Sequence, residues 1–564
     1  MNSFAGLSLD ERKLIVGIDF GTTFSGVAWA ETRRSDHQSV VESWPANIGT
    51  NEGVSSVKVP TEVRYTPNGM EWGFQIPSTV GRHKWFKLGL AGGKVSSVEG
   101  QQKSSDDLTA DYLTALAKHL IYTLEQKVGK VILQTIPIEF CITVPAIWSE
   151  VAKEKTLKAC EKAGLKSDAD ILLVSEPEAA AIFALHGLDP HGLSIGDSFV
   201  LCDAGGGTVD LISYTITDLY PILKVKEAAA GTGDLCGSTF LNRRFGDFLT
   251  AKLGKEPGWD SEIHAEAMEK FDSVIKKQYS PSTSNQDGYL ILVPGLANNE
   301  KLGIRRGRFT VTPAEMSDIF EPVVEKTIKL VKGQIQATNK KISAVILVGG
   351  FGQNNYLKER LRSSVGESVL VLQPPNAWTA VVRGAVMMGL ARANSKLAAV
   401  GLVSRAARKH YGIELRVEFE ADIHDASKKK WSEKHQRYRV LTMDWFIKKG
   451  EPVRESQPTE ITYSTEFLVS DGGPQSACMT IFCDEKTPTA PIHKNSNVRK
   501  LVTLEADFSQ LSLAELENTI KVRKDGKEYY CLKSAIEATF NSASTKYTLL
   551  CQGKRYDAVT AEYA

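Results

Sequence analysis

A short acidic, glycine-rich pattern occurs twice in this 564-residue chain and constrains its fold more than any other feature. The first copy is Gly17-Ile18-Asp19-Phe20-Gly21-Thr22-Thr23, and the second is Asp203-Ala204-Gly205-Gly206-Gly207-Thr208. Each copy follows an apolar run of strand type. Glycines let backbone N–H groups approach phosphate oxygens, threonine hydroxyls add donors, and each aspartate can face a metal ion. The repetition predicts two similar lobes that hold a metal-bound polyphosphate between them.

Either loop alone has a simpler interpretation. Asp-x-Gly-Thr-Thr also fits a strand followed by a tight turn in which Thr or Asp caps a helix. For either loop alone this simpler interpretation is preferred. Around both loops, apolar runs alternate with stretches of helical spacing up to about residue 395. We expect buried strands at 14–18, 141–144, 171–174, 199–202 and 345–348, and helices at 108–128, 150–164 and 313–335. This alternation predicts an α/β fold with mostly parallel sheets covered by helices.

From about Lys396 the pattern changes to short runs rich in β-branched and aromatic residues, separated by Gly, Pro, Asp or Ser. These runs are 411–420, 437–447, 460–468, 478–483, 500–508 and 546–551. They predict a separate, mainly β domain. Residues 511–520 fit one short helix, and Lys524-Asp525-Gly526-Lys527 is typical of a hairpin turn. No extended helical region is expected at the C-terminal end.

Composition narrows the class of protein. The chain is 42% hydrophobic and 24% charged, as in soluble globular proteins, and its formal net charge of +1 gives no electrostatic reason to expect binding to nucleic acid or an anionic membrane. The eight cysteines are scattered in apolar runs, which predicts reduced core residues and no structural metal. Residues 1–13 lack the pattern of a signal peptide, and no apolar run of about 18 residues could span a bilayer. We therefore expect a cytoplasmic protein.

Five motifs occur in a fixed order: 17–23, Ser175-Glu176-Pro177-Glu178-Ala179-Ala180-Ala181, 203–208 with Asp210, 231–237 and 348–352. Together they resemble the actin-like ATPase superfamily and, within it, the nucleotide-binding domain of the 70-kDa heat-shock chaperones. The resemblance implies a two-lobed, duplicated ribonuclease H-like ATPase domain over residues 1–396, with lobe I at about 1–200 and lobe II at about 201–396. Residues 397–564 would form a β-rich, substrate-binding-like domain without a helical lid.

The same resemblance implies roles for individual residues and predicts ATP or ADP with Mg²⁺ as ligands. Asp19 and Asp203 would act on the metal, Glu176 and Asp210 would orient or deprotonate the attacking water, and a lysine would offset charge on the transferring phosphoryl group. That lysine is Lys87, with Lys84 as the alternative. The nucleotide would be held by Gly21, Thr22, Thr23, Gly205, Gly206, Gly207, Thr208, Gly237, Lys276, Lys277, Ser280, Gly349, Gly350 and Phe351.

Several positions depart from the family pattern. Cys236 stands where the family usually has glycine, Phe351 and Gln353 replace a serine and an arginine, and Lys276 and Lys277 cannot stack on adenine as arginine does. These departures predict weaker or altered nucleotide affinity. With the absent helical lid, they resemble the divergent branch of the family that includes heat-shock protein 12.

Three functions are compatible with these motifs. The first is a slow, chaperone-type ATPase in which lobe closure alters the grip of the β domain on a protein or peptide client, with possible co-chaperones. The second is a sugar kinase of the same superfamily, which would need an aspartate base beside a hydroxyl substrate. The third is a nucleotide-binding module that does not hydrolyse ATP or that assembles like actin. The order of the motifs favours the first.

Overall fold

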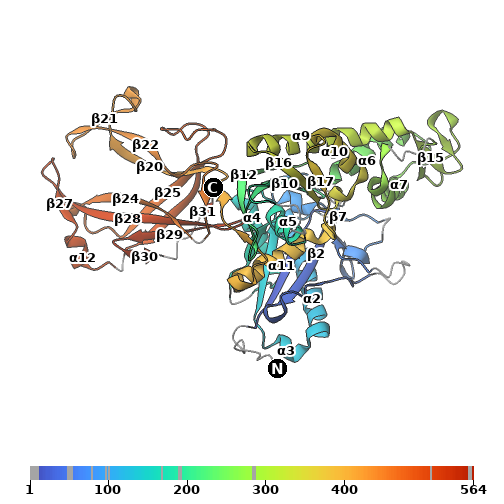
Figure 1. The fold of residues 1–564 in the computed structure, drawn as a ribbon, viewed down its shortest axis with the longest axis horizontal. Coiled ribbons are helices and arrows are strands. Elements are labelled where there is room, and N and C mark those ends of the chain that lie inside the picture. Colours follow the sequence, from blue (N-terminus) through green and yellow to red (C-terminus); the bar gives the residue numbers. More distant parts are fainter. Residues whose placement is uncertain are drawn as a thin grey trace. The chain divides into compact units, whose positions relative to one another are not determined.

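The computed structural model describes residues 12–46, 55–77, 80–95, 98, 102–166, 169–187, 194–281, 287–455, 457–508, 511–556 and 562–563. The chain divides between Leu402 and Val403 into two compact units (Figure 1). The first unit contains α-helices and mixed β-sheets, and the second is almost entirely β. Residues 1–11, which include most of the segment considered for a signal peptide, lie outside the described residues.

The first large sheet of the first unit has the strand order β3-β2-β1-β8-β9. Its strands are β1 (Leu14–Asp19), β2 (Phe24–Glu31), β3 (Ser39–Val40), β8 (Ile138–Val144) and β9 (Leu172–Ser175), and β4 (Val59–Pro60) pairs with β2. β1 is parallel to β8 and antiparallel to β2, and every residue of β1 is buried. Burial on both faces explains why β1 is a continuous apolar run.

The second large sheet has the order β17-β16-β10-β11-β12-β18. Its strands are β10 (Ser198–Ala204), β11 (Val209–Asp218), β12 (Leu223–Asp234), β16 (Ile342–Val348), β17 (Leu370–Leu372) and β18 (Val400–Leu402). β10 is parallel to β16 and antiparallel to β11, which is antiparallel to β12. In both sheets, therefore, a buried strand that ends near an aspartate pairs with an antiparallel neighbour on one side and a parallel neighbour on the other.

The five expected strands are confirmed, but the expectation of mostly parallel sheets was wrong. Both sheets are mixed, because β2, β11 and β12 add antiparallel neighbours. β12 is the clearest case, since most of its residues are only partly buried and its sequence, LKVKEAAAGTGD, has no continuous apolar run. A strand of this kind gives a weak signal in sequence.

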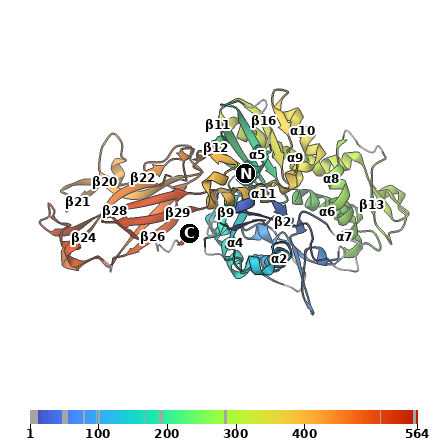
Figure 2. The same ribbon diagram turned by 60° about the horizontal axis from the view of Figure 1, so that its bottom comes forward.

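Two helices rich in small residues join the sheets. α5 (Glu176–His186) contacts β10 and β11 of the second sheet, whereas α11 (Ala380–Ala393) contacts β1, β2 and β8 of the first. The two helices pack against each other (Figures 1 and 2). Their crossing is close, because a Cβ atom added at Gly384 would lie 1.8 Å from the carbonyl oxygen of Ala179. One hydrophobic core therefore includes residues of both sheets and both helices.

The remaining elements of the first unit surround these sheets. The helices are α1 (Phe86–Gly89), α2 (Ser105–Val128), α3 (Lys130–Leu133), α4 (Glu150–Lys162), α6 (Thr239–Leu253), α7 (Ser261–Lys270), α8 (Lys276–Gln278), α9 (Pro313–Thr338) and α10 (Asn355–Val365). The small sheets contain β5 (Glu62–Thr66), β6 (Gly69–Trp72) and β7 (His83–Lys84), and β13 (Tyr289–Leu292), β14 (Ile304–Arg305) and β15 (Arg308–Val311). The three expected helices are confirmed as α2, α4 and α9. A capping box between Thr312 and Glu315 fixes the start of α9.

The second unit contains two larger antiparallel sheets and the pair β19 (Arg405–Ala406) and β23 (Pro452–Val453). One sheet is formed by β20 (His410–Glu418), β21 (Lys430–Ser432), β22 (Arg437–Ile447), β25 (Ser476–Asp484), β26 (Arg499–Asp507) and β31 (Glu562–Tyr563). The other is formed by β24 (Thr459–Leu468), β27 (Ile520–Val522), β28 (Glu528–Phe540), β29 (Thr545–Cys551) and β30 (Lys554–Tyr556). Side chains from both sheets, including Ile481 and Ile536, share one core.

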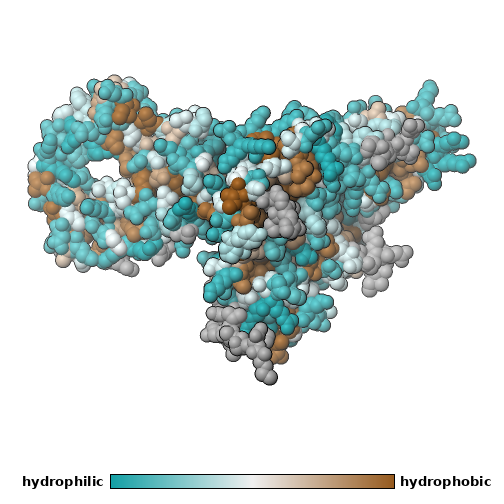
Figure 3. All heavy atoms as spheres, viewed as in Figure 1, coloured by the Kyte–Doolittle hydropathy of each residue, from teal (hydrophilic) through white to brown (hydrophobic). Residues whose placement is uncertain are grey.

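The expected short helix and hairpin of this unit are also confirmed. α12 covers Leu513–Glu517, and β27 pairs with β28 across the turn that contains Gly526. Six of the eight cysteines are buried; Cys531 is intermediate and Cys478 is exposed, and all eight are free thiols. No helix within the described ranges is long and apolar enough to cross a bilayer. On the face seen in Figure 3, hydrophobic residues form separate patches among hydrophilic ones.

Candidate functional site

The first acidic turn joins β1 to β2. Asp19 is the last residue of β1 and is only 4% exposed. Its carboxylate accepts hydrogen bonds from Lys58 Nζ at 2.6 Å and from the Thr143 hydroxyl at 3.3 Å. Gly21 is required for the turn, because a Cβ atom there would lie 2.1 Å from the carbonyl oxygen of Phe24. The turn therefore holds a buried carboxylate at the end of a central strand.

The second acidic turn joins β10 to β11. Asp203 lies near the end of β10, and Thr208 is buried immediately before β11. The backbone of Gly205–Gly207 also bonds to the segment before α6: Gly237 N donates to Gly207 O at 3.1 Å, and Thr239 N donates to Gly206 O at 2.8 Å. Gly237 has no room for a side chain, since its Cβ atom would lie 2.5 Å from Gly206. Gly237, which the sequence predicts to hold the nucleotide, thus lies in close contact with the second turn.

The two turns face each other. A Cβ atom at Gly206 would lie 2.3 Å from Thr23 Oγ1, and one at Gly207 would lie 2.4 Å from Thr22 Oγ1. The structure therefore brings bare glycine backbone of the second turn against threonine hydroxyls of the first. Gly349, which has a φ of +82°, completes this region, because a Cβ atom there would lie 2.5 Å from Asp203 Oδ1. Backbone N–H groups and hydroxyls without intervening side chains are what a phosphate group requires.

Two further carboxyl groups are buried in the same region. Burial raises the pKa of Glu176, the first residue of α5, to about 7, although the charge of Lys87 opposes the shift. Burial also raises the pKa of Asp210 to about 6, against the effect of hydrogen bonding from Thr208. Asp210 Oδ1 accepts the backbone N–H of Ala146 at 3.0 Å. Raised carboxyl pKa values in one buried cluster are typical of sites that bind cations or move protons.

Lys87 is the lysine that the structure brings to these acids. Its side chain is 2% exposed, and Nζ lies 2.5 Å from Glu176 Oε1. Lys84, the alternative in the sequence, is 39% exposed at its side chain and pairs with Glu62 at 3.2 Å. The two lysines diverge because Trp85, between them, has a left-handed backbone with a φ of 62°.

The acids fit a divalent cation. Burial, followed by the charges of Glu176, Asp210 and Asp19, raises the pKa of Asp203 well above its usual range, whereas Lys58 opposes the shift. Within the part of the chain that the structure describes, no lysine or arginine forms an ion pair with Asp203. A buried carboxyl group surrounded by other acids favours a bound cation, and oxygen ligands suit Mg²⁺.

The residues expected near adenine and ribose have other partners. Lys276 forms an ion pair with Asp272 and donates to Asn242 Oδ1 at 2.9 Å. Ser280 is buried and donates to Glu359 at 2.7 Å, and Lys277 is exposed. Gly350 is close to the indole of Trp378, since a Cβ atom there would lie 3.4 Å from Nε1.

Phe351 does not face the acidic cluster. Its side chain is 3% exposed and belongs to the hydrophobic core formed by the second sheet, α6, α9 and α10. The expected contact of this side chain with the nucleotide is therefore not supported by its position. The residue is apolar because it fills the core, and only its backbone is left for a ligand.

Sequence reasoning missed two neighbours of the acids, Lys58 and Thr143, and one neighbour of Lys87, Trp148. Lys58 pairs with Asp19, Thr143 donates to it, and the ammonium group of Lys87 lies 5.3 Å from the ring centroid of Trp148. Thr143 is the polar residue in the otherwise apolar, buried run Phe140–Val144 of β8, which is the one signal that could have marked it. Lys58 lies in no motif.

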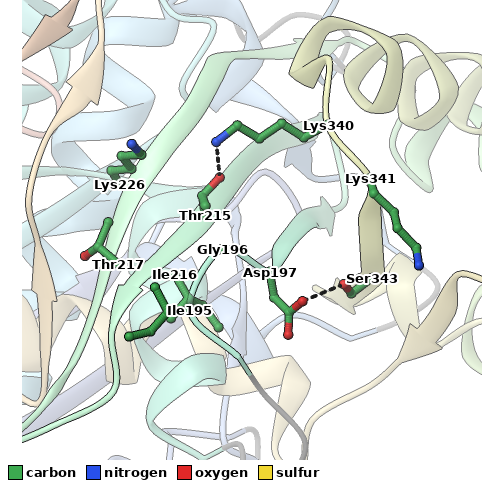
Figure 4. Close-up of a pocket in the computed structure, with 10 residues that line it drawn as sticks. All are labelled: Ile195, Gly196, Asp197, Thr215, Ile216, Thr217, Lys226, Lys340, Lys341 and Ser343. Atoms are coloured by element: carbon green, nitrogen blue, oxygen red, sulfur yellow. Dashed lines mark hydrogen bonds between the residues drawn. The ribbon is translucent and has the colours of Figure 1, made fainter.

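A cavity of about 690 Å³ opens elsewhere in the first unit (Figure 4). It lies beside Asp197 and Lys341, which precede β10 and β16, whereas Asp203 lies near the other end of β10. Lys340 donates to Thr215 and Ser343 donates to Asp197 at its wall. Ligands of open α/β sheets bind beyond the carboxyl ends of strands, and this cavity is at the amino ends. It is therefore distinct from the acidic cluster.

Comparison with known proteins agrees with the motifs. A family model described as Hsp70 protein matches residues 87–419, and a domain of unknown function matches residues 405–563. Heat shock 70 kDa protein 12A of Homo sapiens is 24% identical over 474 residues, covering 67% of this chain and 69% of that protein. Heat shock 70 kDa protein 12B of Homo sapiens is also 24% identical, covering 67% of this chain and 68% of that protein.

A third relative is the chaperone protein DnaK of Mycoplasma mycoides, which is 27% identical over 384 residues, covering 67% of this chain and 60% of DnaK. The 12A and 12B relatives confirm the predicted resemblance to the branch that includes heat-shock protein 12. Because the Hsp70 model covers more than half of its residues, this chain belongs to the Hsp70 family.

Proposed function

We propose that the first unit binds ATP or ADP with Mg²⁺ and hydrolyses ATP slowly, and that its nucleotide state controls partner binding by the β-rich unit. Membership of the Hsp70 family supports a nucleotide-binding, chaperone-like function. The observation that carries the proposal is the meeting of the two acidic turns. They come from different sheets, yet Gly206 and Gly207 face Thr23 and Thr22 next to a cluster of four buried carboxyl groups.

In this proposal the two turns bind the phosphates. The N–H groups of Gly206 and Gly207 and the hydroxyls of Thr22 and Thr23 would donate to phosphate oxygens. Asp19 and Asp203 hold the Mg²⁺ ion through its waters. The ion would neutralise charge on the phosphates as the terminal phosphoryl group is transferred.

Glu176 and Asp210 prepare the attacking water. A carboxyl group with a pKa of about 7 can accept a proton near neutral pH, which suits Glu176 to act as the general base. Asp210 is fixed by the backbone N–H of Ala146 and orients the same water. Lys87 offsets charge on the phosphoryl oxygens, and the apolar rings of Phe20 and Trp148 limit access of bulk water to its ammonium group.

The base of the nucleotide would be held weakly. Lys276 and Ser280 already bond to Asp272 and Glu359, and the side chain of Phe351 lies in the core. These arrangements support the predicted weaker or altered affinity for adenine nucleotides. Gly349 and Gly350 would contact the adenosine through their backbone.

We also propose the finer architecture. The shared strand order of the two sheets supports a duplicated, ribonuclease H-like pair of lobes at about 1–200 and 201–396, followed by the β-rich domain at 397–564. The β-rich domain would bind a protein or peptide client, with possible co-chaperones. A cytoplasmic location remains a prediction.

Isothermal titration calorimetry with ATP or ADP, with and without Mg²⁺, tests nucleotide binding, and single-turnover assays test hydrolysis. Saturable binding to the wild-type chain is expected, and no binding of either nucleotide in Mg²⁺ would contradict the proposal. Binding without hydrolysis would instead support the nucleotide-binding module. Sugar-dependent turnover would support a kinase, and sedimentation that requires ATP would support actin-like assembly.

A further inference from the structure

Lys58 is a buried lysine at the candidate phosphate site that belongs to none of the family motifs. It immediately precedes β4, which pairs with β2, and its Nζ lies 2.6 Å from Asp19 Oδ2. The exposed fractions of the two side chains are 8% and 6%. A lysine is rarely this buried unless its ammonium group has a specific task or partner.

The strands direct Lys58 to this position. In the register of β1 and β2, Gly26 is opposite Asp19. A Cβ atom at Gly26 would lie 3.2 Å from Cγ and 3.5 Å from Cε of Lys58, so the lysine stem passes directly over the glycine. The missing side chain at position 26 thus leaves a path by which Lys58 reaches the acidic turn.

The charge of Lys58 acts on both acidic turns. It neutralises Asp19 directly, and it also favours the charged form of Asp203. Among the described residues, the buried lysines are Lys58 and Lys87, which pair with two of the four acids Asp19, Glu176, Asp203 and Asp210. Its ammonium group has three N–H donors, of which Asp19 uses one, so donors remain for the oxygens of a phosphate in this cluster.

We propose that Lys58 is a phosphate-binding cation built into the site, which lets this chain bind nucleotide with a reduced requirement for Mg²⁺. This inference rests on the proposed nucleotide site. A phosphate oxygen and the Asp19 carboxylate share the ammonium group, so part of the charge that a divalent ion would supply is already present. Lys58 is thereby a specificity-determining residue: it favours polyphosphate ligands whether or not the metal accompanies them.

The test is calorimetric titration of the full chain with ADP, in excess Mg²⁺ and in EDTA. For the wild type, removal of Mg²⁺ should weaken binding by about tenfold or less, whereas for Lys58→Met it should weaken binding by about a hundredfold or more. Lys13→Met is the matched control. Lys13 pairs with Glu139 at 2.6 Å, but it precedes β1 at the opposite end of the strand from Asp19. In Lys13→Met, the ratio of the ADP affinity in Mg²⁺ to that in EDTA should therefore stay at the wild-type value.

Two more variants separate binding from folding. Asp19→Asn should keep or improve binding in EDTA, because Lys58 is released from its partner. The double variant Asp19→Asn with Lys58→Met removes both charges of this pair, so neither partner is left buried without the other. It should lose binding in EDTA while its thermal unfolding remains cooperative.

The outcomes distinguish the inference from the function on which it rests. If the wild type binds ADP in Mg²⁺ but Lys58→Met has the same ratio of affinities, the inference is wrong and the nucleotide site stands. If the ADP affinity of the wild type fell by more than about a hundredfold in EDTA, the inference would likewise be wrong while the nucleotide site stands. If the wild type binds no nucleotide in Mg²⁺, both proposals fail.

Discussion

The crossing of α5 and α11 offers a sharp test of how the fold positions the site. In Gly384→Ala, the new Cβ atom would start 1.8 Å from the carbonyl oxygen of Ala179. Reaching an ordinary van der Waals separation requires the helices to move apart by roughly 1.5 Å. The three atoms nearest to the new Cβ atom are all backbone atoms of Ala179, which cannot rotate away as a side chain can.

The expected change in the free energy of unfolding follows from two opposing effects. Replacing glycine by alanine inside a helix favours the helix by about 0.5–1 kcal/mol, but overpacking a close contact costs about 1–3 kcal/mol and occasionally more. We therefore expect Gly384→Ala to lower the free energy of unfolding by about 1–2 kcal/mol or more. Nucleotide affinity should fall as well, because α5 begins with Glu176 and because Gly349 N donates to the carbonyl of Ala377, just before α11.

The matched control is Gly333→Ala, in the C-terminal part of α9. A Cβ atom at Gly333 meets nothing within 4 Å, so only the gain in helix propensity remains, and stability should rise by about 0.5–1 kcal/mol. Urea unfolding of both variants, followed by tryptophan fluorescence, measures the difference. If Gly384→Ala were as stable as the wild type, the close helix crossing would not be what holds the two sheets together.

Three other predictions concern the acids. Glu176→Gln should leave ATP affinity within about threefold of the wild type but slow single-turnover hydrolysis by about 10²–10⁴-fold. The control Glu150→Gln, also at the first position of a helix, should change neither the affinity nor the rate. An equal loss of affinity and rate in Glu176→Gln would refute its role as the general base. Asp203→Asn should abolish the effect of Mg²⁺ on nucleotide affinity in the same calorimetric assay, while Asp197→Asn, before the other end of β10, should retain it. Because the pKa of Glu176 is raised from 4.5 to about 7 by burial, the nucleotide-free protein should lose up to about 3 kcal/mol of stability as pH rises through that window. Urea midpoints at several pH values should show this slope in the wild type and a shallower one in Glu176→Gln; equal slopes would mean that Glu176 does not titrate there.

The parts of the fold that the sequence predicts are those with a local signal. β1, β8, β10 and β16 each contain a mostly apolar run because most of their residues are buried, and the acids at the ends of β1 and β10 stand out against these runs. β11 and β12 carry alternating or small residues, so their antiparallel pairing, and with it the mixed character of the sheets, emerges only in the structure.

The parts of the site that the sequence does not predict depend on contacts distant in the chain. The sequence could not separate Lys84 from Lys87, because only the left-handed turn at Trp85 sends one to Glu62 and the other to Glu176. Lys58 reaches Asp19 across 39 positions, and its path depends on a glycine in a third segment. No spacing rule connects such residues, since the chain between them is free to vary in length.

The two ends of the proposed nucleotide site differ in a consistent way. At the phosphate end, a buried lysine outside the family motifs adds positive charge beside Asp19. At the base end, the polar groups expected to hold adenosine are bonded to Asp272 and Glu359. A hydrogen bond made within the protein must be exchanged when a ligand binds, so Lys276 and Ser280 would contribute less to affinity than Lys58, whose ammonium group has N–H donors beyond the one that Asp19 accepts. For the proposed nucleotide site we therefore expect the phosphates to contribute more binding energy than the base, so that affinity depends on the number of phosphate groups more than on the identity of the base.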